Sequence, residues 1–208
     1  MGWLENVIFK NQELANERLE LADKNALYYL STGLTLRNCT VILKVPASRL
    51  IIKQACFINC TFEVKQQLNN HQSWVYASLK GCRFKGRFSG CDFGHWPDYS
   101  QGAEHGSLED CDFTEARLDA CRFHGCDMRT LRLPRWPCFT LLEPHRHASA
   151  LRGVQWPGTF GDVAVAYLHE HPESSVALSF HAPTAARFFK TTEEELKAAI
   201  ERFDCFVY

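Results

Sequence analysis

Large apolar residues recur at every fifth position between residues 106 and 133. They are Leu108, Phe113, Leu118, Phe123, Met128 and Leu133, and two residues before each stands Gly106, Cys111, Ala116, Cys121, Cys126 or Leu131. A period of five matches neither the 3.6-residue period of an amphipathic helix nor the two-residue period of a strand. The segment therefore predicts a repeat architecture in which each five-residue unit forms one side of a narrow coil. We expect the large side chain to fill the centre and the small one to pack near the backbone.

The same spacing recurs upstream, with changes of register. The pairs of small and large positions are Leu34/Leu36, Cys39/Val41, Leu50/Ile52, Ala55/Phe57, Cys60/Phe62, Gln72/Trp74, Ala77/Leu79, Cys82/Phe84, Gly86/Phe88 and Cys91/Phe93. Residues 94–107 interrupt the pattern and are rich in Gly, Pro and polar residues, which predicts a loop extending from one corner of the coil.

At these residues the chain resembles the pentapeptide-repeat family, whose pattern is a small residue, any residue, and then Leu or Phe. The resemblance covers residues 34–138 and implies a right-handed quadrilateral β-helix with four five-residue units in each coil. We therefore expect a mainly β fold built on a short, degenerate pentapeptide-repeat β-helix.

The flanking segments lack the repeat and predict two smaller parts. Residues 1–33 are expected to form an N-terminal helical cap, with a helix from Asn11 to Lys24 whose apolar side carries Leu14, Leu19 and Leu21. Residues 139–208 are expected to form a small α/β domain. Its most distinct helix is predicted over 192–203, where Thr192 and Glu195 form a capping box.

The positions of the ten cysteines are more informative than their number. Seven occupy the small position of the repeat (residues 39, 60, 82, 91, 111, 121 and 126), and the sequence contains no C-x-x-C motif. This distribution favours buried, reduced thiols over disulfides or a zinc site. Reduced thiols indicate a cytoplasmic protein, as does the lack of a secretion signal, and we expect no membrane partner.

Charge is distributed in blocks, although the net charge is only −1. Residues 34–93 contain nine Lys or Arg against two acids (+7), residues 94–119 one Arg against seven acids (−6), and residues 120–152 six Arg against two acids (+4). Alternating blocks suit a shaped protein partner better than a uniform polyanion. The predicted partner-binding residues lie in and beside the acidic block: Asp92, Trp96, Asp98, Tyr99, Glu104, Glu109 and Asp110. For Trp96, an interface anchor and local packing of the loop both stay open.

Recognisable catalytic motifs are absent from the sequence. It contains no Gly-rich phosphate loop, no G-x-S-x-G and no H-E-x-x-H, so we expect no catalytic residues, metal or cofactor. The nearest candidates are the pairs His145/His147 and His169/His171 and the thiols of Cys138 and Cys205, which lie outside the repeat.

Three functions compete. The resemblance favours a non-enzymatic protein-binding inhibitor, namely an immunity protein that neutralises a cognate bacterial toxin of the type VI or contact-dependent kind, such as a nuclease, without binding nucleic acid itself. The alternative is a DNA mimic that protects a topoisomerase, which requires a continuous acidic stripe, whereas the first half of the repeat is basic. The third is an enzyme that uses His169, His171 or Cys205 of the C-terminal domain.

Overall fold

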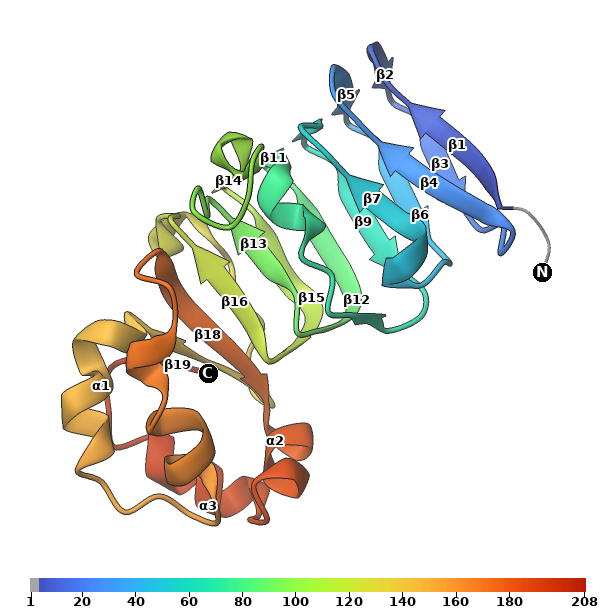
Figure 1. Cartoon of the computed structure of the whole chain (residues 1–208). Helices are drawn as coiled ribbons and strands as arrows, with labels where there is room; N and C mark the ends of the chain where they lie inside the picture. Colours follow the sequence, from blue (N-terminus) through green and yellow to red (C-terminus); the bar gives the residue numbers. More distant parts are fainter. Residues whose placement is uncertain (1–3) are drawn as a thin grey trace.

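Parallel strands wind around a common axis and form a β-solenoid. The structure is a computed structural model that describes residues 4–208. Figure 1 shows the strands stacked from the N-terminal end toward the helices of the C-terminal part. Face 1 contains β1 (Glu5–Phe9), β4 (Ala26–Leu30) and β7 (Leu50–Ile52). Face 2 contains β2 (Gln12–Ala15), β5 (Leu34–Arg37), β8 (Cys56–Ile58), β11 (Ser78–Lys80) and β14 (Ser107–Glu109).

Face 4 is the side of the solenoid that follows face 3, and the last two strands of face 3 extend onto it. Face 3 contains β3 (Arg18–Leu21), β6 (Thr40–Leu43), β9 (Thr61–Val64), β12 (Arg83–Ser89) and β15 (Asp112–Asp119). The second halves of β12 and β15 continue past the corner onto face 4, where β12 pairs with β10 (Leu68–Asn69). Single 3-10 turns, η1 (Ala47–Arg49) and η2 (Ser73–Tyr76), replace strand at two further places.

The large position of each repeat fills the solenoid with stacked aromatic rings. On face 3, the ring centroids of Phe62 and Phe84 lie 5.2 Å apart and those of Phe84 and Phe113 lie 4.5 Å apart, with the rings nearly parallel. A second column contains Trp74, Phe93 and Phe123. All of these side chains are fully buried, so the repeat positions are core positions.

Thiols form two columns beside the backbone, and all of them except Cys138 occupy the small position of the repeat. The columns are Cys39, Cys60, Cys82 and Cys111, and Cys91, Cys121 and Cys138. Each thiol donates to a carbonyl of the preceding coil: Cys60 Sγ lies 3.3 Å from Leu36 O, and Cys121 Sγ lies 3.6 Å from Phe88 O. All ten cysteines are free.

The corner between faces 2 and 3 uses a residue with left-handed backbone conformation in every coil. Asn38, Asn59, Gly81 and Asp110 have φ between 53° and 64° there. Asn and Gly adopt this conformation at least cost, which explains why they precede the cysteine of the repeat. At Gly81 a Cβ atom would also overlap the side-chain oxygen of Asn59 in the coil before.

The N-terminal segment belongs to the solenoid, and the predicted helical cap is wrong. Residues 11–24 contain β2 and β3 instead of a helix, and β1, β2 and β3 pair in parallel with β4, β5 and β6. The physical reason is that Leu14 and Leu19 are five residues apart and follow Phe9 at the same interval, which is the period of the coil. The solenoid therefore begins at Glu5 and not at residue 34.

The C-terminal part closes the other end of the solenoid. Its sheet has the order β13-β16-β18-β17-β19, so that β18 (Ser175–His181) pairs antiparallel with β16 (Cys121–His124), which in turn follows β13 (Asp92–Gly94). β17 (Cys138–Leu142) and β19 (Phe206–Val207) complete the sheet. The helices are α1 (Pro144–Arg152), α2 (Ala182–Phe188) and α3 (Glu193–Ile200), with a π turn η5 (Gly161–Val165) and a 3-10 turn η6 (Leu168–Glu170).

A second hydrophobic core lies under these helices. It contains Phe139, Phe160, Leu178 and Leu196, whereas Ala177 of the same strand β18 packs into the solenoid core. Thr192 and Glu195 form the capping box of α3 that the sequence predicts. Among residues 4–208, no helix combines the length and apolar character needed to cross a membrane.

Candidate functional site

The acidic segment connects β13 to β14 and is fixed at both ends. We call residues 95–106 the acidic loop; it contains one 3-10 turn, η3 (Ala103–His105). Gly106 lies at its base, where a Cβ would overlap the carbonyl oxygens of Val75 and Gly94. His95 Nδ1 lies 3.1 Å from Gly106 O, and the Tyr99 hydroxyl donates to Gln72 at 2.8 Å. The loop is therefore held against the solenoid.

Trp96 packs against the solenoid and remains half-buried. Its ring stacks on His124 with a centroid distance of 4.3 Å, and the Arg122 guanidinium lies 5.3 Å from the ring centroid. Tyr99 contacts the same ring at 4.6 Å. Local packing thus accounts for one face of Trp96, and part of its surface stays accessible.

Asp92 is not accessible to a partner, and we remove it from the predicted binding residues. It is fully buried, and its carboxylate accepts from Arg122 at 2.6 and 2.9 Å and lies 2.9 Å from His124 Nε2. Burial opposes its ionisation, but the hydrogen bonds with His124 and Arg122 outweigh burial and lower the pKa of Asp92. Asp92 is the first residue of β13, so it lies on a strand and not in the acidic loop.

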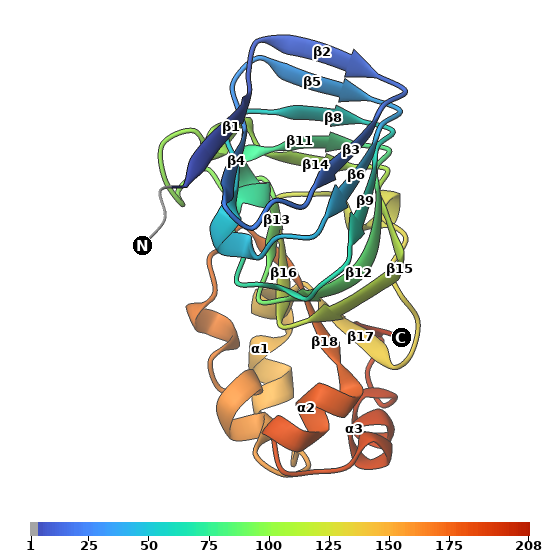
Figure 2. The same ribbon diagram turned by 90° about the vertical axis from the view of Figure 1, so that its right-hand side faces the viewer.

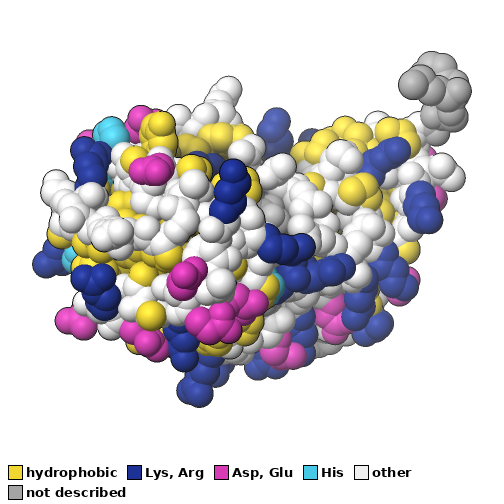
Figure 3. Space-filling view, turned by 90° about the horizontal axis from the view of Figure 1, so that it is seen from below, with side chains coloured by type: hydrophobic (Ala, Val, Ile, Leu, Met, Phe, Trp, Pro, Cys, Tyr) yellow, Lys and Arg dark blue, Asp and Glu magenta, His cyan; other side chains and the backbone are white. Residues whose placement is uncertain are grey.

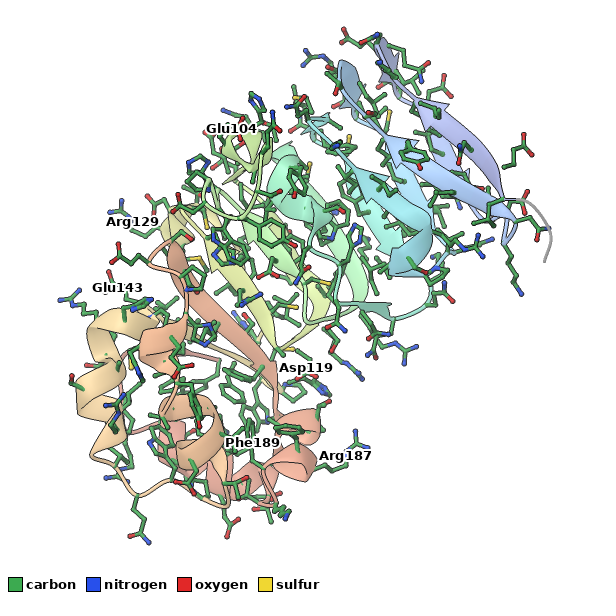
Figure 4. All side chains as sticks on the ribbon, viewed as in Figure 1. Glu104, Asp119, Arg129, Glu143, Arg187 and Phe189 are labelled. Carbon is green, nitrogen blue, oxygen red and sulfur yellow. The ribbon has the colours of Figure 1, made fainter. Side chains whose placement is uncertain are left out.

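The four other acids are exposed. Asp98 and Glu104 lie in the acidic loop, and Figure 4 places Glu104 at the outer margin of the solenoid. Glu109 ends β14 and pairs with Lys80 of the neighbouring strand at 3.0 Å. Asp110 is the corner residue that follows it. Lys80 offsets the charge of Glu109, so Asp98, Glu104 and Asp110 provide the less compensated negative charge.

Asp92, His124 and Ser174 form a chain of hydrogen bonds. Ser174 Oγ lies 3.2 Å from His124 Nδ1, and the other ring nitrogen faces Asp92. This order of groups is that of a serine nucleophile and its base. However, His124 has no exposed surface and is covered by Trp96, so a substrate has no access to the imidazole. We therefore assign the cluster to holding the C-terminal part and the acidic loop on β16.

A groove lies where the C-terminal part meets the last coil. This junction groove has a volume of about 400 Å³ and is lined by Arg122 and Cys121 of β16 together with Tyr167, His171, Leu178 and Phe188. Three of the largest exposed apolar side chains surround it: Val163, Tyr167 and Phe188 are 46%, 52% and 67% exposed. In Figure 4, Phe189, the residue after Phe188, points inward between α2 and the sheet. No local pattern in the sequence predicts this groove, because β16 is about 40 to 70 residues from the other segments that line it.

The histidines and thiols considered for catalysis are dispersed. His171 lies in the wall of the junction groove, where burial and the positive charge of Arg122 lower its pKa to about 4. His169 contacts Arg152, His145 contacts the carbonyl of Pro172, and Cys205 is buried in the C-terminal core. Within residues 4–208, no group of three or more His, Cys, Asp or Glu side chains is arranged to hold a metal ion.

Comparison with known proteins agrees with this geometry. The stacked parallel strands and the five-residue core pattern define a β-solenoid, a class whose extended faces fit a role in protein interaction. Residues 104–130 match the family described as Pentapeptide repeats (8 copies). The pentapeptide repeat recognised in the sequence is thereby confirmed over these residues. A search of curated proteins gave no significant match.

Proposed function

We propose that this protein is a non-enzymatic inhibitor that binds another protein: an immunity protein that neutralises a cognate bacterial toxin. The observation that carries the proposal is the position of Arg122. Its guanidinium lies over Trp96 of the acidic loop, and the same side chain lines the junction groove. The loop and the groove therefore form one continuous surface that combines negative charge with exposed apolar side chains.

This combination suits a tight protein complex. Asp98 and Glu104 attract a basic partner and accelerate its association. Tyr167 and Phe188 flank a groove that a partner's apolar side chain could fill, and such buried anchors supply most of the binding energy. A nuclease fits this surface, because its active cleft must be basic to hold phosphates.

The distribution of charge on the solenoid favours an inhibitor over a DNA mimic. Along face 3, Glu20 pairs with Lys44, Asp112 with Arg83 and Arg132, and Glu115 with Lys85. On the side shown in Figure 3, Lys and Arg side chains are likewise interspersed with Asp and Glu over the solenoid. A mimic of duplex DNA needs a continuous stripe of one sign, since DNA carries one negative charge per about 1.7 Å of helix axis.

Co-expression with the product of the neighbouring gene tests the proposal. An immunity protein is expected to be encoded beside its toxin, so the adjacent coding sequence provides the candidate. We expect that protein to stop bacterial growth when produced alone, and growth to resume when this chain is produced with it. Growth arrest that this chain does not relieve, together with no binding between the two purified proteins, would contradict the proposal.

Binding kinetics with the purified toxin test which surface is used. Reversing Asp98 and Glu104 to Lys should slow association most at low salt, whereas Phe188→Ala should accelerate dissociation by about thirty-fold, the effect of a lost anchor worth about 2 kcal/mol. The matched control reverses two exposed acids that lie outside the acidic loop and do not line the groove, Glu143 and Glu201, and should leave both rates unchanged. Equal effects of the two double reversals would show that only net charge matters.

A further inference from the structure

The N-terminal end of the solenoid is open. β1, β2 and β3 are the outermost strands of their sheets, and no strand within residues 4–208 pairs with their outer edges. Figure 2 views the solenoid from this end and shows β2 spanning the side between β1 and β3. The opposite end differs, because β18 pairs with β16 there. Unpaired strand edges are a ready template for pairing with another chain.

The hydrophobic core also reaches the surface at this end. Val7, Phe9, Leu14 and Leu19 point inward but are only partly buried, whereas the residues stacked on them in the second coil are buried. Ile8, on the outer side of β1, is 57% exposed. An exposed core bounded by three free edges is a surface that stable proteins cover.

We propose that a second copy of this chain covers this end and forms a twofold-symmetric dimer. The twofold axis of the dimer is perpendicular to the solenoid axis and passes through Leu14. The inward positions are symmetric about Leu14 in sequence: Phe9 and Leu19 lie five residues to either side, and Val7 and Leu21 lie seven. A twofold axis through β2 therefore places Leu14 on Leu14 of the second copy. It also places Phe9 opposite Leu19, which continues the core across the interface, and Val7 opposite Leu21, which is already buried within its own chain.

The backbone groups match in the same register. Gln12 N and Asn16 N donate to carbonyls of the second coil, and the carbonyls of Glu17 and Leu21 accept from it. Because successive residues of a strand direct their backbone groups to opposite edges, Glu13, Ala15, Arg18 and Glu20 present theirs at the free edge. The proposed axis pairs Glu13 with Ala15 of the second copy and Ile8 with Glu20. Free donors thus meet free acceptors in antiparallel pairing.

One contact in this register is unfavourable and provides a sharp test. Lys10 and Arg18 lie four residues to either side of Leu14, so the axis places them opposite each other twice in the dimer. Replacing Lys10 with Glu would convert both contacts into attractive pairs. We expect Lys10→Glu to tighten the dimer roughly ten-fold, because opposite charges on facing strands attract, like charges there repel, and the change acts at two contacts.

Sedimentation equilibrium of the full chain tests the proposal. At about 100 µM we expect dimers, because even a micromolar dissociation constant leaves most chains paired at that concentration. Ala15→Pro removes a free-edge N–H without touching a bond to the second coil and should weaken the dimer by at least about ten-fold. Ala15→Ser keeps the N–H and should dimerise like the wild type. Circular dichroism confirms that each variant is folded.

Two results would overturn the inference. One is a wild-type chain that stays monomeric at this concentration. The other is a dimer that Ala15→Pro and Lys10→Glu leave unchanged, which would locate the interface elsewhere. Neither result bears on toxin binding, because the acidic loop and the junction groove lie at the far coils of the solenoid.

Discussion

Arg122 has three roles that only its surroundings explain. It neutralises the buried carboxylate of Asp92, lies over the ring of Trp96, and lines the junction groove with a side chain that is 28% exposed. A bidentate guanidinium is suited to such a position because its planar fork binds a carboxylate while its face contacts an aromatic ring. This residue therefore links the buried charges of β13 and β16 to the proposed binding surface.

The cysteines test how tightly the repeat is packed. Burial raises the pKa of the Cys121 thiol, which keeps it protonated and unreactive. We expect Cys121→Ser to lower the free energy of unfolding by about 1 kcal/mol, because the hydroxyl loses apolar burial but retains the carbonyls of Phe88 and Asp119 as acceptors. Urea denaturation measures the change, with Cys56→Ser at a half-buried site as the neutral control. A loss above about 3 kcal/mol would mean that serine finds no acceptor there.

Two histidines make stability depend on pH. Burial lowers the pKa of His71 to about 4, and burial also dominates the similar lowering at His171. Unfolded histidine titrates near 6.5, so between about pH 6.5 and 4 the unfolded chain binds more protons, and stability falls as the pH falls. For His71 the loss from pH 7 to 4.5 should reach about 2–3 kcal/mol.

Urea denaturation of His71→Gln at the two pH values measures the share of this residue. The variant should lose about 2 kcal/mol less than the wild type over that interval, whereas His105→Gln, at an exposed site, should behave as the wild type does. An unchanged pH dependence in His71→Gln would show that His71 is not neutral and buried in solution.

At the scale of elements, the N-terminal strands show why local propensity fails in a solenoid. The segment from Asn11 to Lys24 is rich in Glu, Leu and Ala, which favour helix, yet it forms β2 and β3. Asn11 and Asn16 occupy left-handed corners with φ of 51° and 60°, and β2 between them pairs with β5 of the next coil, which has the same period. Tertiary pairing outweighs propensity differences of a few tenths of a kcal/mol per residue.

At the base of the acidic loop, the backbone of Gly106 packs closely against the backbone of Val75 and Gly94. Gly106→Ala should displace the base of the loop and lower the free energy of unfolding by about 1–3 kcal/mol, since the new methyl group would overlap the carbonyls of Val75 and Gly94. Gly153→Ala is the matched control: its nearest heavy atom is 3.8 Å away and its φ of −75° suits alanine. Thermal denaturation of both variants gives the comparison, and equal melting temperatures would show that the base of the loop yields easily.

At the scale of the whole molecule, the two hydrophobic cores are joined by β17 and β18, since Leu142 of β17 packs against the solenoid core and Leu141 lies in the C-terminal core. Ala177 of β18 packs into the solenoid core, and Leu178 of the same strand packs under the C-terminal helices. β18 also pairs with both β16 and β17. The C-terminal part and the solenoid should therefore unfold as one cooperative unit.

Calorimetry tests this cooperativity. We expect a single transition, and both Phe113→Ala in the solenoid core and Phe139→Ala in the C-terminal core should lower that same melting temperature by roughly 10 °C, given a cavity cost of about 3–5 kcal/mol. Two transitions, each shifted by one variant alone, would mean that the parts unfold separately.

The sequence by itself determined the repeat, its core positions and its resemblance to the pentapeptide-repeat family, because one residue in five must fill a narrow coil and this requirement is visible in a linear pattern. It also located the acidic loop as an interruption of that pattern. Tertiary structure decided the rest. The N-terminal coil follows the five-residue period but lacks the small residue of the repeat. Asp92 and His124 become partners only because β13 and β16 pair. The junction groove is lined by segments that are distant in the chain. Such features arise from contacts between coils, which no local window of sequence contains.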